Sequence, residues 1–143
     1  MTTQLSDYRF VVTGGGSGIG EATARMAASR GAYVMIGDLD RDAAHAAAER
    51  IRADDGRAEA MQVDVADPGS VTAFMSGAAE ALGGIDVLAN NAGVADAILT
   101  DRVSIGELPL EVWDRVFAVN VRGTFLCTRA AVQHLRRSSH GSV

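Results

Sequence analysis

Residues 8–20 read Tyr-Arg-Phe-Val-Val-Thr-Gly-Gly-Gly-Ser-Gly-Ile-Gly. A short apolar run rich in β-branched residues breaks into glycines and is followed at once by the helix-forming residues 21–30. This order predicts a strand buried on both faces, a tight turn and a helix N-terminus. Gly14, Gly18 and Gly20 keep Cβ atoms out of the turn, so that backbone N–H groups can approach a ligand and the helix can pack close to the strand. The first helical turn offers unpaired N–H groups and a positive dipole end, and we expect an anion to bind there.

The spacing of these glycines carries more information than their number, because glycines alone also fit a flexible loop. The pattern is Gly-x-x-x-Gly-x-Gly, preceded by Thr13 and placed directly after the first predicted strand. It resembles the cofactor loop of the short-chain dehydrogenase/reductase family. The cofactor-binding positions that this resemblance implies in the loop are Thr13, Gly14, Ser17, Gly18, Ile19 and Gly20.

The composition is that of a soluble globular chain of one domain, residues 1–143. Apolar residues make up 48 % of the chain and charged residues 22 %, and this length is enough to bury a core. A net charge of −5 gives no support to nucleic-acid binding. The sequence contains neither an apolar segment of membrane-spanning length nor the basic and apolar regions of a signal peptide. We therefore expect a cytoplasmic protein without a membrane partner.

The cysteine and the histidines predict no metal site. Cys127 is the single cysteine and falls in an apolar helical stretch, which favours a buried packing role and fits a reducing compartment. His45, His134 and His140 lack paired metal-ligand spacing. All 13 basic side chains are arginine, so these residues supply no lysine for any mechanism.

Strand and helix patterns alternate along the chain, which predicts an α/β fold with a doubly wound parallel sheet, the Rossmann fold. Further strands are expected at residues 33–37, 57–63 and 85–89, and helices at 41–53 and from the Asp67-Pro68 cap to Gly83. Residues 94–109 lack periodicity and predict a surface loop. A long helix over 110–137 carries more apolar surface than one sheet contact requires, and 138–143 predict a turn and the first residues of a fifth strand.

Asp38 ends the second predicted strand, where an acid of a dinucleotide fold accepts hydrogen bonds from the adenosine ribose. The carboxylate would lie against the extra phosphate of NADP, and two like charges about 4 Å apart cost about 4 kcal/mol at an effective dielectric of about 20. Asp38, with Leu39 beside it, therefore predicts NAD, and Ser17 agrees because NADP-preferring relatives often carry a basic residue there. An ordinary strand-end cap is the alternative for Asp38, and Arg41 is the nearby cation that would weaken the preference.

Two further strings resemble family motifs. Asp64-Val65 after the third strand looks like the family's adenine-binding pair, with the carboxylate on the exocyclic amine and the Val65 N–H on a ring nitrogen; the alternative is a turn acid. Asn90-Asn91-Ala92-Gly93 after the fourth strand is similar to the family string in which Asn side chains tie strand ends together and the small residues let the nicotinamide ribose lie against backbone. Here the alternative is a turn in which Asn bonds its own backbone. The positions implied for the cofactor are Asp64, Val65, Asn91, Ala92 and Gly93.

Asn120 lies within an apolar helical run, and Asn and Gly123 both weaken a helix. A polar amide in such a run needs a partner. The resemblance implies that Asn120 kinks the helix and holds a water in the proton relay to a catalytic lysine. A solvated Asn on the outer face is the alternative.

The resemblance covers essentially the whole chain and implies hydride transfer between NAD(H) and an alcohol or carbonyl, in a homo-oligomer packed through the long helix. The family's Ser and Tyr-x-x-x-Lys have no counterpart here, because Tyr8 and Tyr33 lie near the first two strands and Ser142 at the entrance of the fifth. We therefore expect a chain that stops after the fourth strand and the following helix, inactive alone. The alternatives are a non-catalytic dinucleotide-binding or regulatory module and, less compatible with the glycine turn and Asp38, a protein used only for interaction.

Overall fold

The computed structural model describes residues 4–95, 100–101 and 103–143. Four parallel strands form one sheet in the order β3-β2-β1-β4. The strands are β1 (Arg9–Thr13), β2 (Tyr33–Asp38), β3 (Arg57–Gln62) and β4 (Val87–Asn90), and the helices are α1 (Gly18–Ser29), α2 (Arg41–Ala53), α3 (Pro68–Leu82), the 3₁₀ turn η1 (Ile105–Glu107), α5 (Leu110–Phe117), the π-helical segment η2 (Ala118–Gly123) and α6 (Thr124–Leu135). The predicted α/β fold with a doubly wound parallel sheet is confirmed.

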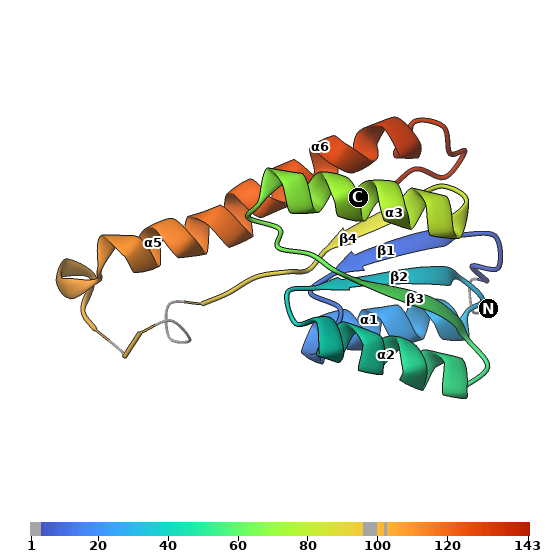
Figure 1. Cartoon of the computed structure of the whole chain (residues 1–143), viewed down its shortest axis with the longest axis horizontal. Helices are drawn as coiled ribbons and strands as arrows, with labels where there is room; N and C mark the ends of the chain where they lie inside the picture. The colour runs from blue at the N-terminus through green and yellow to red at the C-terminus, as the bar shows by residue number, and fades with distance from the viewer. Residues whose placement is uncertain (1–3, 96–99, 102) are drawn as a thin grey trace.

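Helices cover both faces of the sheet (Figure 1). Helices α1 and α2 lie on one face and α3 and α6 on the other, while α5 extends beyond the carboxyl ends of the strands. Because successive strand residues point to opposite faces, Val11 packs with the α3 and α6 side and Val12 with the α1 and α2 side, and both are fully buried. The expectation that the first strand is buried on both faces is confirmed. None of the helices in these described ranges has the length and apolarity needed to cross a membrane.

The two layers of helices use side chains of different size. The buried positions of α1 and α2 are mostly alanine, which lets both helices lie close to the sheet. The opposite layer uses Phe74 and Met75 of α3, and a Cβ at Gly37 of β2 would collide with the Phe74 ring. Cys127 of α6 is completely buried in this layer, and burial raises the pKa of its thiol to about 11. The packing role predicted for Cys127 is confirmed.

The edge beyond β4 receives the end of the chain. Ser142 forms a parallel bridge with Val87, through bonds from Leu88 N to Ser142 O (3.0 Å) and from Ser142 N to Asp86 O (2.9 Å). This agrees with the prediction that residues 138–143 begin a further strand. Strand β4 starts two residues later than predicted, because at Asp86 the side chain as well as the main chain bonds to Arg9.

Asp86 anchors the amino-terminal ends of β1 and β4. It is 3 % exposed, and its carboxylate accepts hydrogen bonds from Arg9 N (2.8 Å), Arg9 Nε (2.7 Å), Arg9 Nη2 (2.6 Å) and Ser138 Oγ (2.5 Å). These bonds, foremost that of the Arg9 side chain, hold the pKa of Asp86 well below its usual range. A single carboxylate thus joins two strands and the turn after α6.

Replacing Asp86 with Asn should lower the free energy of unfolding at pH 7 by about 2–4 kcal/mol, because it leaves a partly buried guanidinium without its counter-charge. The native pKa of Asp86 is depressed, so its stabilising effect is present above about pH 4 and is lost as the pH falls below that value. Urea unfolding at several pH values should show the difference between wild type and Asp86→Asn narrowing below about pH 4.

Glu21→Gln is the matched control, because Glu21 forms an exposed ion pair with Arg50 (2.7 Å). This variant should change stability by less than about 1 kcal/mol. Equal effects of the two substitutions, or a pH-independent effect of Asp86→Asn, would contradict the role of Asp86.

Candidate dinucleotide-binding cleft

The glycine turn between β1 and α1 allows a close approach of three segments. Gly14 has φ +64°, and a Cβ there would lie 2.7 Å from Ala92 Cα. A Cβ at Gly20 would collide with Gly14 O and lie 2.5 Å from Asn91 Nδ2. These two glycines therefore let the start of α1 lie against the turn and the segment after β4, as predicted.

Gly18 has a backbone angle that favours glycine. Among the atoms of the protein itself, a Cβ at Gly18 would meet none within 4 Å, so the clearance predicted there concerns a bound ligand. Its φ of +55° lies in the left-handed region, which L side chains rarely adopt. The residue turns the backbone into α1 at the point where the unpaired N–H groups of the first helical turn begin.

Asp38 is fixed at the carboxyl end of β2 by two main-chain donors. Its Oδ2 accepts from Gly16 N (2.8 Å) and its Oδ1 from Asp40 N (3.0 Å). The strand-end cap left open as an alternative is thus present, but the bond from Gly16 also couples the carboxylate to the glycine turn. The N-cap of α2 is Asp40, whose side chain accepts from Ala43 N (3.0 Å).

Asp64 and Val65 follow β3 and face the same cleft. Asp64 Oδ1 accepts from Ala66 N (2.9 Å), which is the turn bond expected under the alternative interpretation, and Asp64 N donates to Ser70 Oγ (2.9 Å). This pair of bonds fixes the orientation of Asp64 between β3 and α3. The residue therefore supports the turn and lines the cleft at once.

The segment after β4 is tied to the glycine turn. Asn91 Nδ2 donates to Gly14 O (2.9 Å), and Ala92 N donates to Thr13 Oγ1 (3.2 Å). Asn90 Nδ2 donates to Thr128 Oγ1 (3.1 Å) of α6. The alternative in which these side chains bond their own turn is wrong, because their partners belong to other elements. Within the described ranges, the buried Oδ1 of Asn90 has no hydrogen-bond partner.

Asn120 lies in the π-helical segment η2 and bonds to Val94 in the segment after β4. Its Oδ1 accepts from Val94 N (2.8 Å) and its Nδ2 donates to Val94 O (2.8 Å). Both ends of the amide are engaged, so the alternative of a merely solvated Asn is wrong. The predicted continuous helix over 110–137 is also wrong in detail, because the α-helical hydrogen-bond pattern gives way to a π-helix at 118–123 and α6 ends at Leu135.

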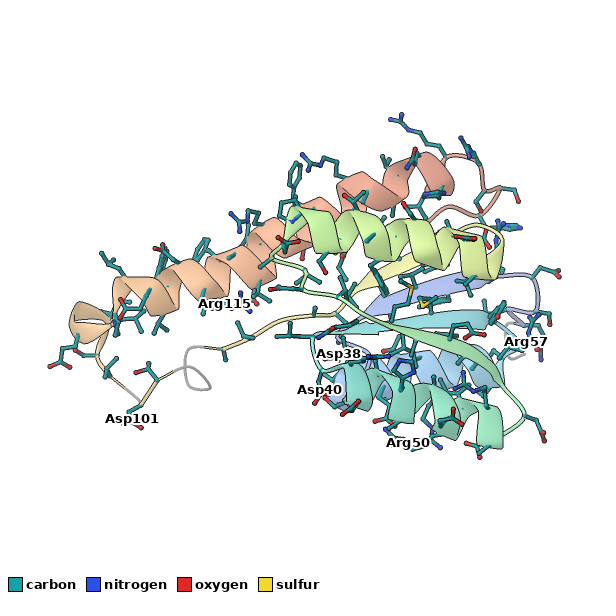
Figure 2. All side chains as sticks on the ribbon, in the orientation of Figure 1. Asp38, Asp40, Arg50, Arg57, Asp101 and Arg115 are labelled. Atoms are coloured by element: carbon teal, nitrogen blue, oxygen red, sulfur yellow. The ribbon has the colours of Figure 1, made fainter. Side chains whose placement is uncertain are left out.

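These segments line a cleft of about 630 Å³ at the carboxyl ends of the strands, and three of its lining residues, Asp38, Asp40 and Arg115, are labelled in Figure 2. The predicted residues that line it are Gly14, Ser17, Gly18, Ile19, Asp38, Leu39, Asp64, Val65, Asn91, Ala92 and Gly93. Three predicted residues, Thr13, Gly20 and Asn120, lie behind the lining and support it through the contacts described above. The sequence thus identified most of the residues that line the cleft.

Five lining residues were not predicted: Asp40, Val63, Val94, Arg115 and Val119. Arg115 and Val119 come from the wall formed by α5 and η2, four residues apart and so on one face of the helix. That spacing was available in the sequence. The sequence does not show which way this face points, because that depends on how α5 extends beyond the carboxyl ends of the strands.

The cleft contains polar groups suited to a dinucleotide. The glycine turn and the N-terminus of α1 present main-chain N–H groups, and Asp38 and Asp64 present carboxylate acceptors. Leu39, Val65 and Val119 add apolar surface. An anion-binding turn, acceptors for hydroxyl or amine groups and an apolar slot are the three features that a nucleotide with a phosphate, a ribose and a base requires.

Comparison with known proteins agrees with this geometry. The sequence model of the short chain dehydrogenase family matches residues 9–143.

The chain belongs to the short-chain dehydrogenase family.

Members of the short-chain dehydrogenase family generally bind NAD or NADP, and several relatives of this chain are oxidoreductases. The chain is 41 % identical over 126 residues (88 % of the chain, 45 % of the relative) to the uncharacterized oxidoreductase YxbG of Bacillus subtilis. It is 40 % identical over 133 residues (93 % and 51 %) to cis-4-hydroxycyclohexanecarboxylate dehydrogenase of Sinomonas cyclohexanicum, and 38 % identical over 128 residues (90 % and 48 %) to meso-2,3-butanediol dehydrogenase of Serratia marcescens. The chain spans about half the length of these relatives.

Alanine substitutions in the glycine turn should lower the free energy of unfolding to different extents. Gly20→Ala should lower the free energy of unfolding by about 1–3 kcal/mol, because the new methyl group overlaps backbone and the Asn91 amide. Gly18→Ala should cost about 1 kcal/mol from backbone strain alone. Thermal unfolding of the variants measures both effects.

Gly106→Ala is the control, since Gly106 has no positive φ and a Cβ there would meet nothing within 4 Å. Its effect should stay within about 0.5 kcal/mol. If Gly20→Ala were as mild as Gly106→Ala, the close approach at the turn would not be a constraint on the fold.

Proposed function

We propose that this chain binds NAD(H) in the cleft and forms the cofactor-binding part of an oxidoreductase that acts on an alcohol or carbonyl compound. The observation that carries the proposal is the position of Asp38. Its carboxylate lines the cleft at the end of β2 while Gly16 N and Asp40 N hold it in one orientation. A fixed carboxylate at this place accepts hydrogen bonds from ribose hydroxyls and repels a phosphate on the same ribose.

The pyrophosphate of the cofactor is assigned to the glycine turn and the N-terminus of α1. Main-chain N–H groups there lack helical partners, and Gly14 and Gly18 have positive φ angles and no Cβ that would keep a ligand away from the turn. The remaining lining residues divide between the two nucleosides. Asp64 and Val65 are assigned to adenine, and residues 91–93 to the nicotinamide ribose.

The nicotinamide ring supplies the hydride acceptor or donor when it is bound. The part assigned to Asn120 is a positioning one: with both amide ends on Val94, it holds the segment after β4 beside the glycine turn. A water relay through Asn120, as the family resemblance implies, belongs to this proposal. The names of the dehydrogenases from Sinomonas and Serratia refer to hydroxylated compounds, which supports an alcohol as the substrate class.

A non-catalytic dinucleotide-binding module is a second candidate, favoured by the tyrosines. Neither lines the cleft: the Tyr33 hydroxyl donates to Glu59 Oε1 (3.0 Å), and the Tyr8 ring stacks on His140 at 5.0 Å. Proton transfer to or from a substrate oxygen requires a donor within hydrogen-bond reach. Under the leading proposal, the Ser and the Tyr-x-x-x-Lys of the family would lie outside these 143 residues, and this chain would be inactive alone; dehydrogenase turnover by the 143 residues would contradict that part.

We also propose a single domain, a cytoplasmic location and a homo-oligomer. The location is supported by the one buried cysteine. Oligomerisation is supported by large apolar side chains exposed along α5, η2 and α6, namely Trp113, Phe117, Val121 and Phe125. Sedimentation of the full chain with and without Phe125→Glu tests the last point.

Asp38→Asn should reduce the preference for NADH over NADPH by at least about tenfold, because it removes the charge that opposes the 2′-phosphate. Asn keeps an oxygen that can accept one of the two main-chain bonds. Isothermal titration calorimetry with both reduced cofactors measures the ratio of the dissociation constants.

Asp42→Asn is the matched control, because Asp42 lies in the exposed first turn of α2 and does not line the cleft. It should leave the ratio unchanged. The proposal would be overturned if wild type bound neither cofactor, or if it preferred NADPH.

A further inference from the structure

Arg115 reaches the cleft from the wall opposite Asp38. It lies on α5, which extends beyond the strand ends, and Figure 2 shows it below that helix on the side of the labelled Asp38. Arg115 and Asp38 both line the cleft, and Arg115 is half-buried. Because Val119 follows one helical turn later on the same face, these two side chains form one continuous strip of the wall.

The charges around Arg115 do not include a fixed partner for it. None of the ion pairs formed by residues 4–95, 100–101 and 103–143 contains Arg115. Among the lining residues in these ranges it is the only cation, facing three carboxylates: Asp38, Asp40 and Asp64. All three carboxylates accept hydrogen bonds from main-chain donors near their own strand or helix ends. The guanidinium of Arg115 therefore adds a positive charge to an acidic cleft, and no ion pair with a described carboxylate neutralises it.

The surface next to Arg115 is apolar and suited to a flat ring. Val65 and Val119 are almost completely buried at the base of the cleft, and a Cβ at Gly123 would lie 2.8 Å from Val65 Cγ2, so η2 and the end of β3 are in close contact. Leu39 also lines the cleft and is 54 % exposed, so its side chain is accessible to a ligand. Leu39 on one side and the strip of Val119 and Arg115 on the other bound a slot.

We propose that Arg115 is a cofactor-binding residue that covers the adenine ring, with its planar guanidinium on the ring face opposite Leu39. This inference rests on the proposed binding of NAD(H). Arginine stacks on aromatic faces through a flat, weakly hydrated cation, whereas lysine presents a compact and strongly hydrated point charge. The half-buried position and the lack of an ion pair leave the guanidinium plane accessible to the base.

The pyrophosphate is a less suitable partner for Arg115. It has its own donors in the glycine turn and at the start of α1, formed by residues 14–20. Arg115 is one turn from Val119, and Val119 packs in the same cluster as Val65 at the end of β3. This neighbourhood is the base end of the cleft, away from the turn.

The test separates the base from the rest of the cofactor. Binding of NADH, 5′-AMP and nicotinamide mononucleotide to the full chain is measured by calorimetry for wild type, Arg115→Leu and Arg115→Lys. Arg115→Leu should weaken binding of NADH and of 5′-AMP by about five- to tenfold, the range of a partly desolvated cation–π contact. Arg115→Lys should show most of the same loss, and binding of nicotinamide mononucleotide should not change.

Arg129→Leu is the matched control, because it removes the same charge from an exposed residue of α6 that does not line the cleft and whose guanidinium lies over the Phe125 ring at 5.2 Å. It should bind all three ligands like wild type. Thermal unfolding of each variant confirms that the fold is kept.

The alternatives give different results. Full affinity of Arg115→Lys for 5′-AMP would show that charge alone matters and would overturn the stacking. An equal loss of affinity for nicotinamide mononucleotide, which carries a phosphate and no adenine, would make Arg115 a phosphate ligand and would overturn the stacking as well. Unchanged NADH binding by Arg115→Leu would refute the inference and leave the proposed function intact, whereas a wild type that binds no NADH would refute the proposed function itself.

Discussion

The contact between the start of α1, the glycine turn and the segment after β4 is the constraint on which the rest of the cleft depends. At Gly20 a single added methyl group would meet the Gly14 carbonyl and the Asn91 amide. The same Asn91 amide donates to Gly14 O, and Thr13 accepts from Ala92 N, so the contact is closed by hydrogen bonds as well as by shape. Residues 13–14 and 91–92, which are more than 70 positions apart in the chain, are thereby held side by side. Their contact fixes the positions of the lining residues on either side.

The two ends of the sheet are organised differently. At the amino-terminal end, the Asp86 carboxylate is buried and saturated by Arg9 and Ser138. At the carboxyl end, Asp38 and Asp64 use oxygens to orient themselves yet remain on the wall of a cleft. Carboxylates thus join strands at one end and line a cleft at the other, which matches the general position of binding sites in open parallel sheets.

The sequence predicted what local chemistry determines. The glycine spacing, the strand-end position of Asp38 and the Asn-Asn-Ala-Gly string all lie next to strands with clear apolar patterns, and strand ends converge in a parallel sheet whatever the helix packing. Arg115 and Val119 were not predicted, because their face becomes part of the cleft only through the passage of α5 beyond the sheet. The partner of Asn120 was also out of reach, since Val94 lies in a stretch without periodicity. The positive φ of Gly18 was not predicted either, because the sequence gives the residue type and not the backbone angle.

The π-helical segment at 118–123 separates two helices that would otherwise form one rod. A π turn holds an extra residue, so the side-chain rotation before and after it is out of phase, by about 100° for each residue that departs from the α-helical repeat. Asn120 and Arg122 secure this offset through Val94 and through Ala66 O (3.0 Å). The segment consequently sets the rotation of α6 relative to α5. With this rotation, Cys127 of α6 points into the core and Arg115 of α5 lines the cleft. Insertion or deletion of one residue in this segment would rotate α6 relative to α5 by about 100°. Either Cys127 would then leave the core or Arg115 would leave the cleft, so the length of the segment matters as much as its sequence.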